Sequence, residues 1–181
     1  LLVDGLLQEN TLRESAKQEA VMSDLNTLVE EGHKVLVYSQ FTSMLNLISS
    51  EVKERQWKYV RLDGKTSDRE AVVRQFQENQ ETSIFLLSLK AGGVGLNLTA
   101  ADYVFLFEPW WNNAAENQAI DRAHRIGRKN SVIAKRYIII ESIEEKMMLL
   151  KESKRSLIDD VVEQEENASS MTAEDFSLLL S

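Results

Sequence analysis

The sequence predicts an α/β fold in which a parallel sheet carries helices on both of its faces. Short apolar runs of strand length alternate with longer stretches whose apolar residues repeat at helical spacing, and this alternation is typical of βαβ units. Turn and capping residues separate the runs. Hydrophobic residues make up 43% of the 181 residues, which is sufficient to bury a core of ordinary domain size.

Five apolar runs, rich in β-branched and aromatic residues, are predicted to be the strands of this sheet. They occupy residues 34–39, 59–62, 84–87, 103–107 and 132–140. The turn pair Asp63-Gly64 closes the second run, and the single proline, Pro109, ends the fourth. Ligands of open α/β sheets bind at the carboxyl ends of the strands, so the residues that follow these runs are the first candidates for function.

Helices are predicted between the strands, where an apolar stripe follows a capping residue. They run over residues 15–31, from 42 to about 55, from 67 to beyond 76, from 112 or 113 to about 127, and from 142 through 150 and on to 162. The third helix begins with a predicted capping box of Ser67 and Glu70, in which each side chain bonds to the amide of the other residue. The last helix begins with a second such box, formed by Ser142 and Glu145.

The organisation of the chain is predicted from changes in this pattern. Residues 1–14 show little periodicity and are predicted to be a leader or linker. Residues 15–140 form the predicted α/β lobe, residues 141–162 a helix packed on it, and residues 163–181 an acidic tail with a short amphipathic end. The chain begins without Met and in the middle of a pattern, which indicates a fragment of a longer protein.

The composition excludes several classes of site. The chain has no cysteine, so disulfides and thiolate metal sites are excluded, and this fits a reducing compartment. Its two histidines, His33 and His124, lie far apart in the sequence, which argues against a dedicated zinc site. No apolar run approaches the ~20 residues that span a bilayer, so no membrane segment is predicted.

The net charge of −8 is unevenly distributed. Residues 156–181 contain seven acidic residues and no basic residue, whereas residues 121–136 contain six basic residues and one acidic residue. The second segment is either a basic patch on a nearly neutral body or a solvated helix face, and the charge pattern alone supports both interpretations.

A glycine-rich turn, Ala91–Gly95, and a pair of arginines, Arg122 and Arg125, both follow predicted strands. Glycines let the backbone approach a ligand closely, and arginines three residues apart on a helix share one face and converge on an anion. The two features together indicate a phosphate site. The alternative is that the arginines pair with Glu116, Asp121 or the acidic tail.

This predicted phosphate site lacks a phosphate loop. No GxxxxGK(S/T) motif is present, because Asp63-Gly64-Lys65-Thr66 has only the last three letters. The dinucleotide fingerprint also fails, since Leu98 stands where the third glycine after Gly93-Val94-Gly95 should be, and no GxSxG elbow supports a serine triad. Catalysis by this chain without another domain is therefore not expected.

Four segments resemble, in order and spacing, the successive motifs of the SWI/SNF-type DNA-dependent ATPases, a branch of the superfamily 2 helicases and translocases. They are VLVYSQFTSML (35–45), RLDGKTS (61–67), SLKAGGVGLNLTAADYVFLFEPWWN (88–112) and NQAIDRAHRIGR (117–128). The resemblance covers residues 15–180 and matches only the second RecA-like lobe of the family. It implies a RecA-like three-layer fold with a parallel sheet and a C-terminal helical extension, in which residues 142–162 are similar to the family's brace helix.

The resemblance implies an ATP site shared with a first RecA-like lobe of the same polypeptide, which would also hold Mg²⁺ for the most part. Arg122 and Arg125 would be arginine fingers that complete ATP hydrolysis across the cleft between the lobes. The other residues implied to lie at the nucleotide are Gly93, Gly95, Asn97 and Gln118.

Double-stranded DNA is the implied track of this motor. The residues implied to contact it are Gln40, Lys65, Ser88, Lys90 and Trp111. DNA-bound proteins are further implied partners, and a membrane is not. The implied location is inside the cell, in the cytoplasm or nucleoid of a bacterium or in the nucleus of a eukaryote.

The sequence departs from the family pattern at three positions. Leu89 stands in place of the usual Thr, Asn113 in place of Pro and Arg128 in place of Gln. The last change gives His-Arg-Ile-Gly-Arg, as in DEAD-box RNA helicases, although Ser131 stands where that family has another Arg. A DEAD-box-like RNA unwinding lobe and a non-catalytic interaction module therefore remain as alternatives.

Overall fold

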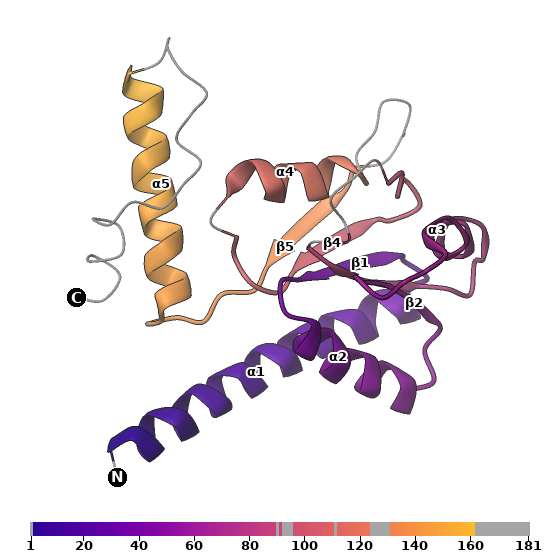
Figure 1. Cartoon of the computed structure of the whole chain (residues 1–181), viewed down its shortest axis with the longest axis horizontal. Coiled ribbons are helices and arrows are strands. Elements are labelled where there is room, and N and C mark those ends of the chain that lie inside the picture. Colours follow the sequence, from indigo (N-terminus) through magenta and orange to yellow (C-terminus); the bar gives the residue numbers. More distant parts are fainter. Residues whose placement is uncertain (1, 90, 92–95, 111, 124–130, 162–181) are drawn as a thin grey trace.

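The structure of the chain is a computed structural model (Figure 1). It describes residues 2–89, 91, 96–110, 112–123 and 131–161. Within these ranges it describes the side chains from residue 16 to residue 153, except that of Asn113. The predicted acidic tail at 163–181 lies outside the described residues.

Five strands form a parallel sheet with the order β2-β3-β1-β4-β5. They are β1 (Val35–Ser39), β2 (Tyr59–Leu62), β3 (Ile84–Ser88), β4 (Tyr103–Leu106) and β5 (Ile133–Arg136). The central strand β1 pairs in parallel with both β3 and β4, so that Val35 lies opposite Ile84 on one side and Tyr103 on the other. All five predicted strands are confirmed, although the fifth is shorter than the predicted run 132–140.

Helices cover both faces of the sheet, which produces three layers (Figure 1). One face carries α1 (Leu2–Glu30) and α2 (Thr42–Glu54), and the other carries α3 (Arg69–Glu78) and α4 (Asn113–Asp121). The predicted fold class, a parallel sheet with helices on both faces, is confirmed.

Each face of the sheet has its own apolar core. Successive residues of a strand point in opposite directions, so Val35 and Val37 of β1 face α1 and α2, whereas Leu36 and Tyr38 face α3 and α4. The first core is closed by the buried stripes of its two helices, Val21, Met22, Leu25, Leu28, Leu45, Ile48 and Val52. The second core contains the buried rings of Phe76, Phe85 and Trp110.

A fifth helix, α5 (Ile143–Val161), stands beside the sheet and not on either face (Figure 1). Ser142 caps its start, because the Ser142 hydroxyl accepts from the amides of Glu144 and Glu145 at 3.1 and 3.4 Å. The carboxylate of Glu145 accepts from the amide of Glu141, however, and not from that of Ser142. The predicted helical extension and its Ser142 cap are confirmed, whereas the reciprocal bond of the capping box is wrong.

The predicted start of the first helix at residue 15 is wrong. The helix α1 begins at Leu2 and runs through residues 2–14 of the predicted leader. Helix propagation from a packed segment is inexpensive once a nucleus exists, and the leader contains Leu, Gln and Glu, which favour helix. Low hydrophobic periodicity therefore does not exclude helix here, and a linker role for these residues stays a prediction.

The predicted capping box at the start of α3 is also wrong, by one residue. The helix begins at Arg69, and Asp68 is its N-cap, with Oδ1 accepting from the amide of Ala71 at 2.9 Å. An aspartate and a serine serve equally well as caps, so the sequence does not distinguish Asp68 from Ser67.

The described part of α4 is shorter than the predicted helix. Asn112 is its N-cap and accepts from the amides of Ala114 and Ala115, which confirms one of the two predicted caps. The helix ends at Asp121, so Arg122 lies at the C-cap and not within the helix. Arg122 keeps αR dihedral angles at this position. Because Arg125 lies outside the described residues, the shared face of Arg122 and Arg125 stays a prediction.

Candidate functional site

The carboxyl ends of the strands meet at one edge of the molecule, because all five strands run parallel. Ser39 and Ser88 are the last residues of the adjacent strands β1 and β3 and lie opposite each other. The segments that follow β1 and β2 at this edge carry the predicted site residues Gln40 and Lys65. The edge on which function is expected is thus the edge on which these segments lie.

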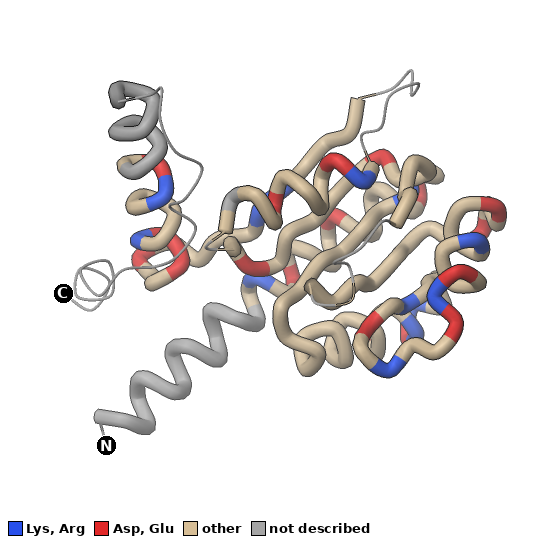
Figure 2. The backbone as a smooth tube through the Cα atoms, turned by 45° about the horizontal axis from the view of Figure 1, so that its top comes forward, with Lys and Arg blue, Asp and Glu red and all other residues tan. Residues whose placement is uncertain are grey.

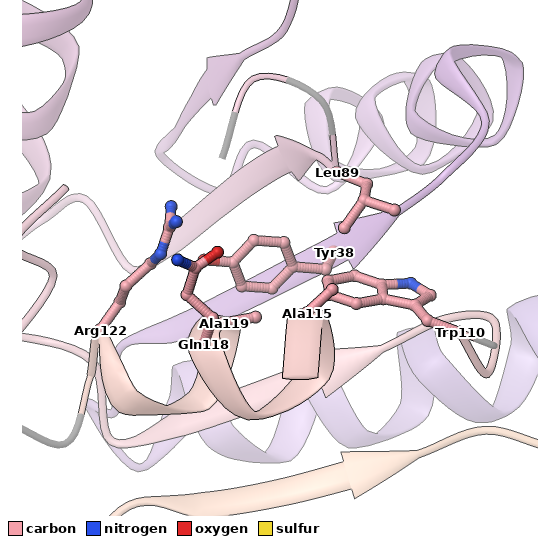
Figure 3. Close-up of a pocket in the computed structure, with 7 residues that line it drawn as sticks. All are labelled: Tyr38, Leu89, Trp110, Ala115, Gln118, Ala119 and Arg122. Atoms are coloured by element: carbon pink, nitrogen blue, oxygen red, sulfur yellow. The ribbon is translucent and has the colours of Figure 1, made fainter. Parts of the chain in front are cut away.

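A pocket of about 170 Å³ lies at this edge, between β1 and α4 (Figure 3). It is lined by Tyr38, Leu89, Trp110, Ala115, Gln118, Ala119 and Arg122. The ring of Trp110 packs edge-on against that of Tyr38, with 5.7 Å between the ring centroids and 83° between the planes. In Figure 3 the Gln118 amide and the Arg122 guanidinium lie toward one end of the Tyr38 ring, and Trp110 lies toward the other.

Three buried donor atoms of this pocket have no hydrogen-bond partner among the described residues: the hydroxyl of Tyr38, Nε1 of Trp110 and Nη1 of Arg122. The three residues are 1%, 2% and 6% exposed. Burial raises the pKa of the Tyr38 hydroxyl, although the nearby Arg122 guanidinium opposes the shift, so this group stays protonated at neutral pH. Buried donors without partners cost free energy, and one of these is cationic. The pocket therefore suits an anionic ligand that is rich in acceptors.

Three of the residues implied to lie at the nucleotide belong to the described residues, and they are neighbours. Gln118 and Arg122 line the same pocket. The carbonyl oxygen of Arg122 accepts from the amide of Leu98 at 3.1 Å, which places Asn97 beside the end of α4. Asn97 itself is exposed. Gly93, Gly95 and Arg125 lie outside the described residues, so their roles stay predictions.

Of the residues implied to contact DNA, Gln40 and Lys65 are exposed at this edge. The amide nitrogen of the Gln40 side chain donates to the carbonyl oxygen of Pro109 at 3.4 Å. Ser88 is only 4% exposed, and its hydroxyl accepts from the amide of Ala91, so in this conformation it is not at the surface. Lys90 and Trp111 lie outside the described residues.

The segment 121–136 does not form a basic patch among its described residues. Arg122 is buried in the pocket, Lys135 pairs with Asp24 at 3.1 Å, and Arg136 pairs with Glu116 at 2.9 Å. Figure 2 shows basic and acidic residues interspersed along the described chain. The alternative that Glu116 pairs with Arg122 is not observed, since the Glu116 carboxylate contacts Arg136 and Lys151. For Arg125, which lies outside the described residues, this alternative stays open.

Residues 16–127 match the protein family described as the helicase conserved C-terminal domain. The matched range includes four strands of the sheet and the helix that leads to Arg122. The chain belongs to this family.

Relatives place this helicase C-terminal domain in the SWI2/SNF2 group. It is 42% identical over 158 residues to the DNA repair protein RAD5B of Arabidopsis thaliana, a match that covers 85% of this chain but 12% of RAD5B. The structure of the C-terminal part of the Fun30 ATPase domain is similar with a TM-score of 0.74 and 33% identity, over 90% of this chain and 51% of that one.

The Sulfolobus solfataricus SWI2/SNF2 ATPase core, solved in complex with dsDNA, is similar with a TM-score of 0.69 and 32% identity. This match covers 91% of the present chain and 33% of that core. The resemblance to SWI/SNF-type ATPases and the RecA-like fold, both expected from the sequence, are thereby confirmed.

Glu108 connects two loops of the helicase domain at the site edge, and sequence patterns did not indicate it. Its carboxylate accepts from the Ser39 hydroxyl at 2.8 Å and from the Gln40 amide at 3.0 Å. Burial raises the pKa of Glu108, and the Gln40 and Ser39 donors and the Lys17 ammonium oppose the shift. The carboxylate thus holds the segment after β1 against the segment after β4. The sequence signal that could have indicated Glu108 is its position directly after a predicted buried strand.

Asp63 forms a tight turn that presents Lys65 after β2. Its Oδ1 accepts from the Lys65 amide at 2.9 Å, and its Oδ2 accepts from Nε of Arg61 at 2.8 Å. Its amide donates to the Thr66 hydroxyl at 3.0 Å. The pKa of Asp63 is lowered from its ordinary value of 3.8. The hydrogen bond from the Lys65 amide is the largest cause and Arg61 adds to it, whereas burial opposes the shift.

The substitution Asp63→Asn is expected to destabilise this domain at neutral pH and not in acid. A lowered pKa in the folded state means that the carboxylate stabilises the fold above pH 3.8, and that this contribution is lost as the pH falls through the lowered pKa. The substitution should reduce the free energy of unfolding by about 1 kcal/mol at pH 7, since hydrogen bonds to a charged acceptor are weakened. Urea unfolding of both proteins, repeated toward about pH 3, checks this. A difference that grows in acid contradicts it.

Among the described residues, no three His, Asp or Glu side chains form a group that could hold a metal ion. A site for Mg²⁺ mainly on another lobe stays a prediction. No helix in the described part of the chain is long and apolar enough to cross a membrane.

Proposed function

We propose that this chain is the second motor lobe of an ATP-driven translocase or remodeller of double-stranded DNA. The observation that carries the proposal is Arg122, a buried arginine with an unpartnered Nη1 in a pocket at the carboxyl edge of a RecA-like sheet. The first RecA-like lobe of the same polypeptide would supply the phosphate loop that the sequence lacks and most of the ligands of Mg²⁺. The chain spans 12% of RAD5B, so much of such a protein lies beyond the matched part.

ATP bound with Mg²⁺ supplies the phosphoryl group that is transferred to water. Arg122 would neutralise the charge on that group, since a guanidinium presents a rigid fork of donors to phosphate oxygens. Arg125 would be a second finger. Gln118 and Asn97 adjoin Arg122 and would border the nucleotide, together with Gly93 and Gly95.

The same edge would face the DNA backbone. Lys65 and Gln40 are exposed there, and Ser88, Lys90 and Trp111 are the further contacts that the family pattern implies. Support for duplex DNA as the track comes from the Sulfolobus ATPase core, which was solved with dsDNA. A relative named as a DNA repair protein supports a role on DNA and, in a eukaryote, a nuclear location. DNA-bound proteins would be further partners.

The direct test is ATP turnover by the full-length protein with no nucleic acid, with duplex DNA and with RNA. Duplex DNA is expected to stimulate turnover, and the 181-residue chain alone is expected to show none. Stimulation by RNA alone would support the DEAD-box-like alternative. An absence of turnover under all three conditions would support a non-catalytic module.

The substitution Lys65→Ala is expected to weaken DNA binding by removing one phosphate contact. Each neutralised phosphate contributes about 0.9 to the slope of log K against log salt, so the slope should become shallower by about that amount. Anisotropy titrations of the full-length protein with duplex DNA at several salt concentrations measure it. The matched control is Lys58→Ala, because Lys58 is exposed at the opposite end of β2. Equal slopes for the two variants would show that Lys65 does not contact the DNA backbone.

A further inference from the structure

A buried cluster of charged side chains joins α5 to α4. Glu116, in the first turn of α4, is 2% exposed. Its Oε1 accepts from the Trp110 amide at 2.7 Å and from Nζ of Lys151 at 3.0 Å. Its Oε2 accepts from Nε of Arg136 at 2.9 Å. A buried carboxylate requires partners of this kind, so the cluster fixes the position of each group in it.

Lys151 makes a second contact within this cluster. It is 7% exposed, and its ammonium group also donates to the carbonyl oxygen of Trp110. A side chain of α5 therefore holds Trp110 twice, directly at its carbonyl oxygen and through Glu116 at its amide. The ring of Trp110 lines the pocket that contains Arg122. A displacement of α5 would thus be transmitted to the backbone at the edge of the pocket.

A separate ion pair attaches α5 to α1. Nζ of Lys17 donates to both carboxylate oxygens of Glu144, at 2.6 and 2.8 Å. Lys17 is buried and the Glu144 side chain is 24% exposed, so this pair is partly shielded from solvent. It anchors the first turn of α5 without touching Trp110 or Glu116. The two ion pairs therefore provide a natural comparison, because they hold one helix at different places.

We propose that Lys151 is a positioning residue that links the placement of α5 to the response of the motor to DNA. The inference rests on the proposed function. Trp111, the implied DNA contact, directly follows Trp110, while Glu116 belongs to the helix that carries Gln118 and ends at Arg122. With α5 in place, Lys151 holds the segment that leads to DNA and the helix that leads to the nucleotide as one unit. Without Lys151, Glu116 keeps Arg136 and the Trp110 amide, and the segment is released from α5.

The test measures ATP turnover of the full-length protein against the concentration of duplex DNA. Lys151→Met keeps an unbranched apolar stem and removes the charge and the donors. It is expected to raise the DNA concentration at half-maximal turnover about tenfold, because one coupling interaction is lost, while the KM for ATP stays unchanged. Lys151→Arg keeps a charged donor and is expected to restore the wild-type value.

The matched control is Lys17→Met, which removes the other anchor of α5. It is expected to lower the melting temperature and to leave the half-saturating DNA concentration unchanged. An equal rise in both variants, or no rise in Lys151→Met, would overturn the proposal. If Lys151→Met does not fold, Lys151→Leu, which also lacks the charge and the donors, is judged by the same criterion. Wild-type protein that duplex DNA does not stimulate would overturn the proposed function itself, before any variant is compared.

Discussion

The substitution Arg122→Ala in the full-length protein is expected to lower DNA-stimulated ATP turnover by about 10³-fold or more. An arginine that stabilises the charge of a transferring phosphoryl group contributes on this scale. The pocket shows why Arg122 is suited to this role. Its Nη1 is buried and has no hydrogen-bond partner among the described residues, so the group is desolvated before a phosphate reaches it and has no competing bond to break at that atom.

The same geometry predicts that the fold survives this substitution. An unpartnered buried donor destabilises the folded state, so removing it is expected to leave the melting temperature unchanged or to raise it. The bond between the Leu98 amide and the backbone oxygen of residue 122 does not depend on the side chain. DNA binding in the absence of ATP should be retained, because Arg122 lines the pocket whereas Gln40, Lys65 and Ser88 do not.

Two further variants distinguish a specific role from a general effect of charge. Arg122→Lys keeps the charge and loses the planar fork of donors, so most of the activity should still be lost. Arg74→Ala removes an exposed arginine of α3 and should leave turnover unchanged. Turnover by Arg122→Ala within about threefold of wild type would exclude a finger role and favour a non-catalytic module.

The strands and their common edge could be predicted because the information is local. A buried parallel strand such as Ile84–Ser88 is a short apolar run whatever its partners are, and the turn residues that bound it are adjacent in sequence. The direction of the strands then places every following loop on one edge. The placement of Gln40 and Lys65 on that edge follows from the direction of β1 and β2 and requires no knowledge of side-chain contacts.

The contacts that define the site could not be predicted in this way. Lys151 and Glu116 are separated by 35 residues, so neither the charge pattern nor the helical spacing in the sequence relates one to the other. Tyr38 belongs to an apolar run and was indistinguishable from core, although its hydroxyl lacks a partner in the pocket. Helix ends were also uncertain, because Asp68 and Ser67 are both good caps and the energy difference between them is small.

The largest expected effect on stability comes from Phe85→Ala, which should lower the free energy of unfolding by about 3–5 kcal/mol. Phe85 is fully buried on β3, in the core between the sheet and the helices α3 and α4. Its ring lies 5.2 Å from that of Phe76. Alanine would leave a cavity that two packed layers cannot close, and the lost contacts add to the lost transfer free energy.

Phe41→Ala is the matched control for this substitution, since it removes the same side chain from a position that is 60% exposed. Its cost should stay within about 0.5 kcal/mol, because an exposed ring transfers little apolar surface out of water on folding. Urea unfolding of the two variants measures how the free energy of unfolding depends on burial, because both variants replace Phe by Ala. If Phe85→Ala costs no more than Phe41→Ala, the core on the α3 and α4 side does not hold the sheet. The pocket would then lose its support as well, because Tyr38 and Trp110 belong to the same core.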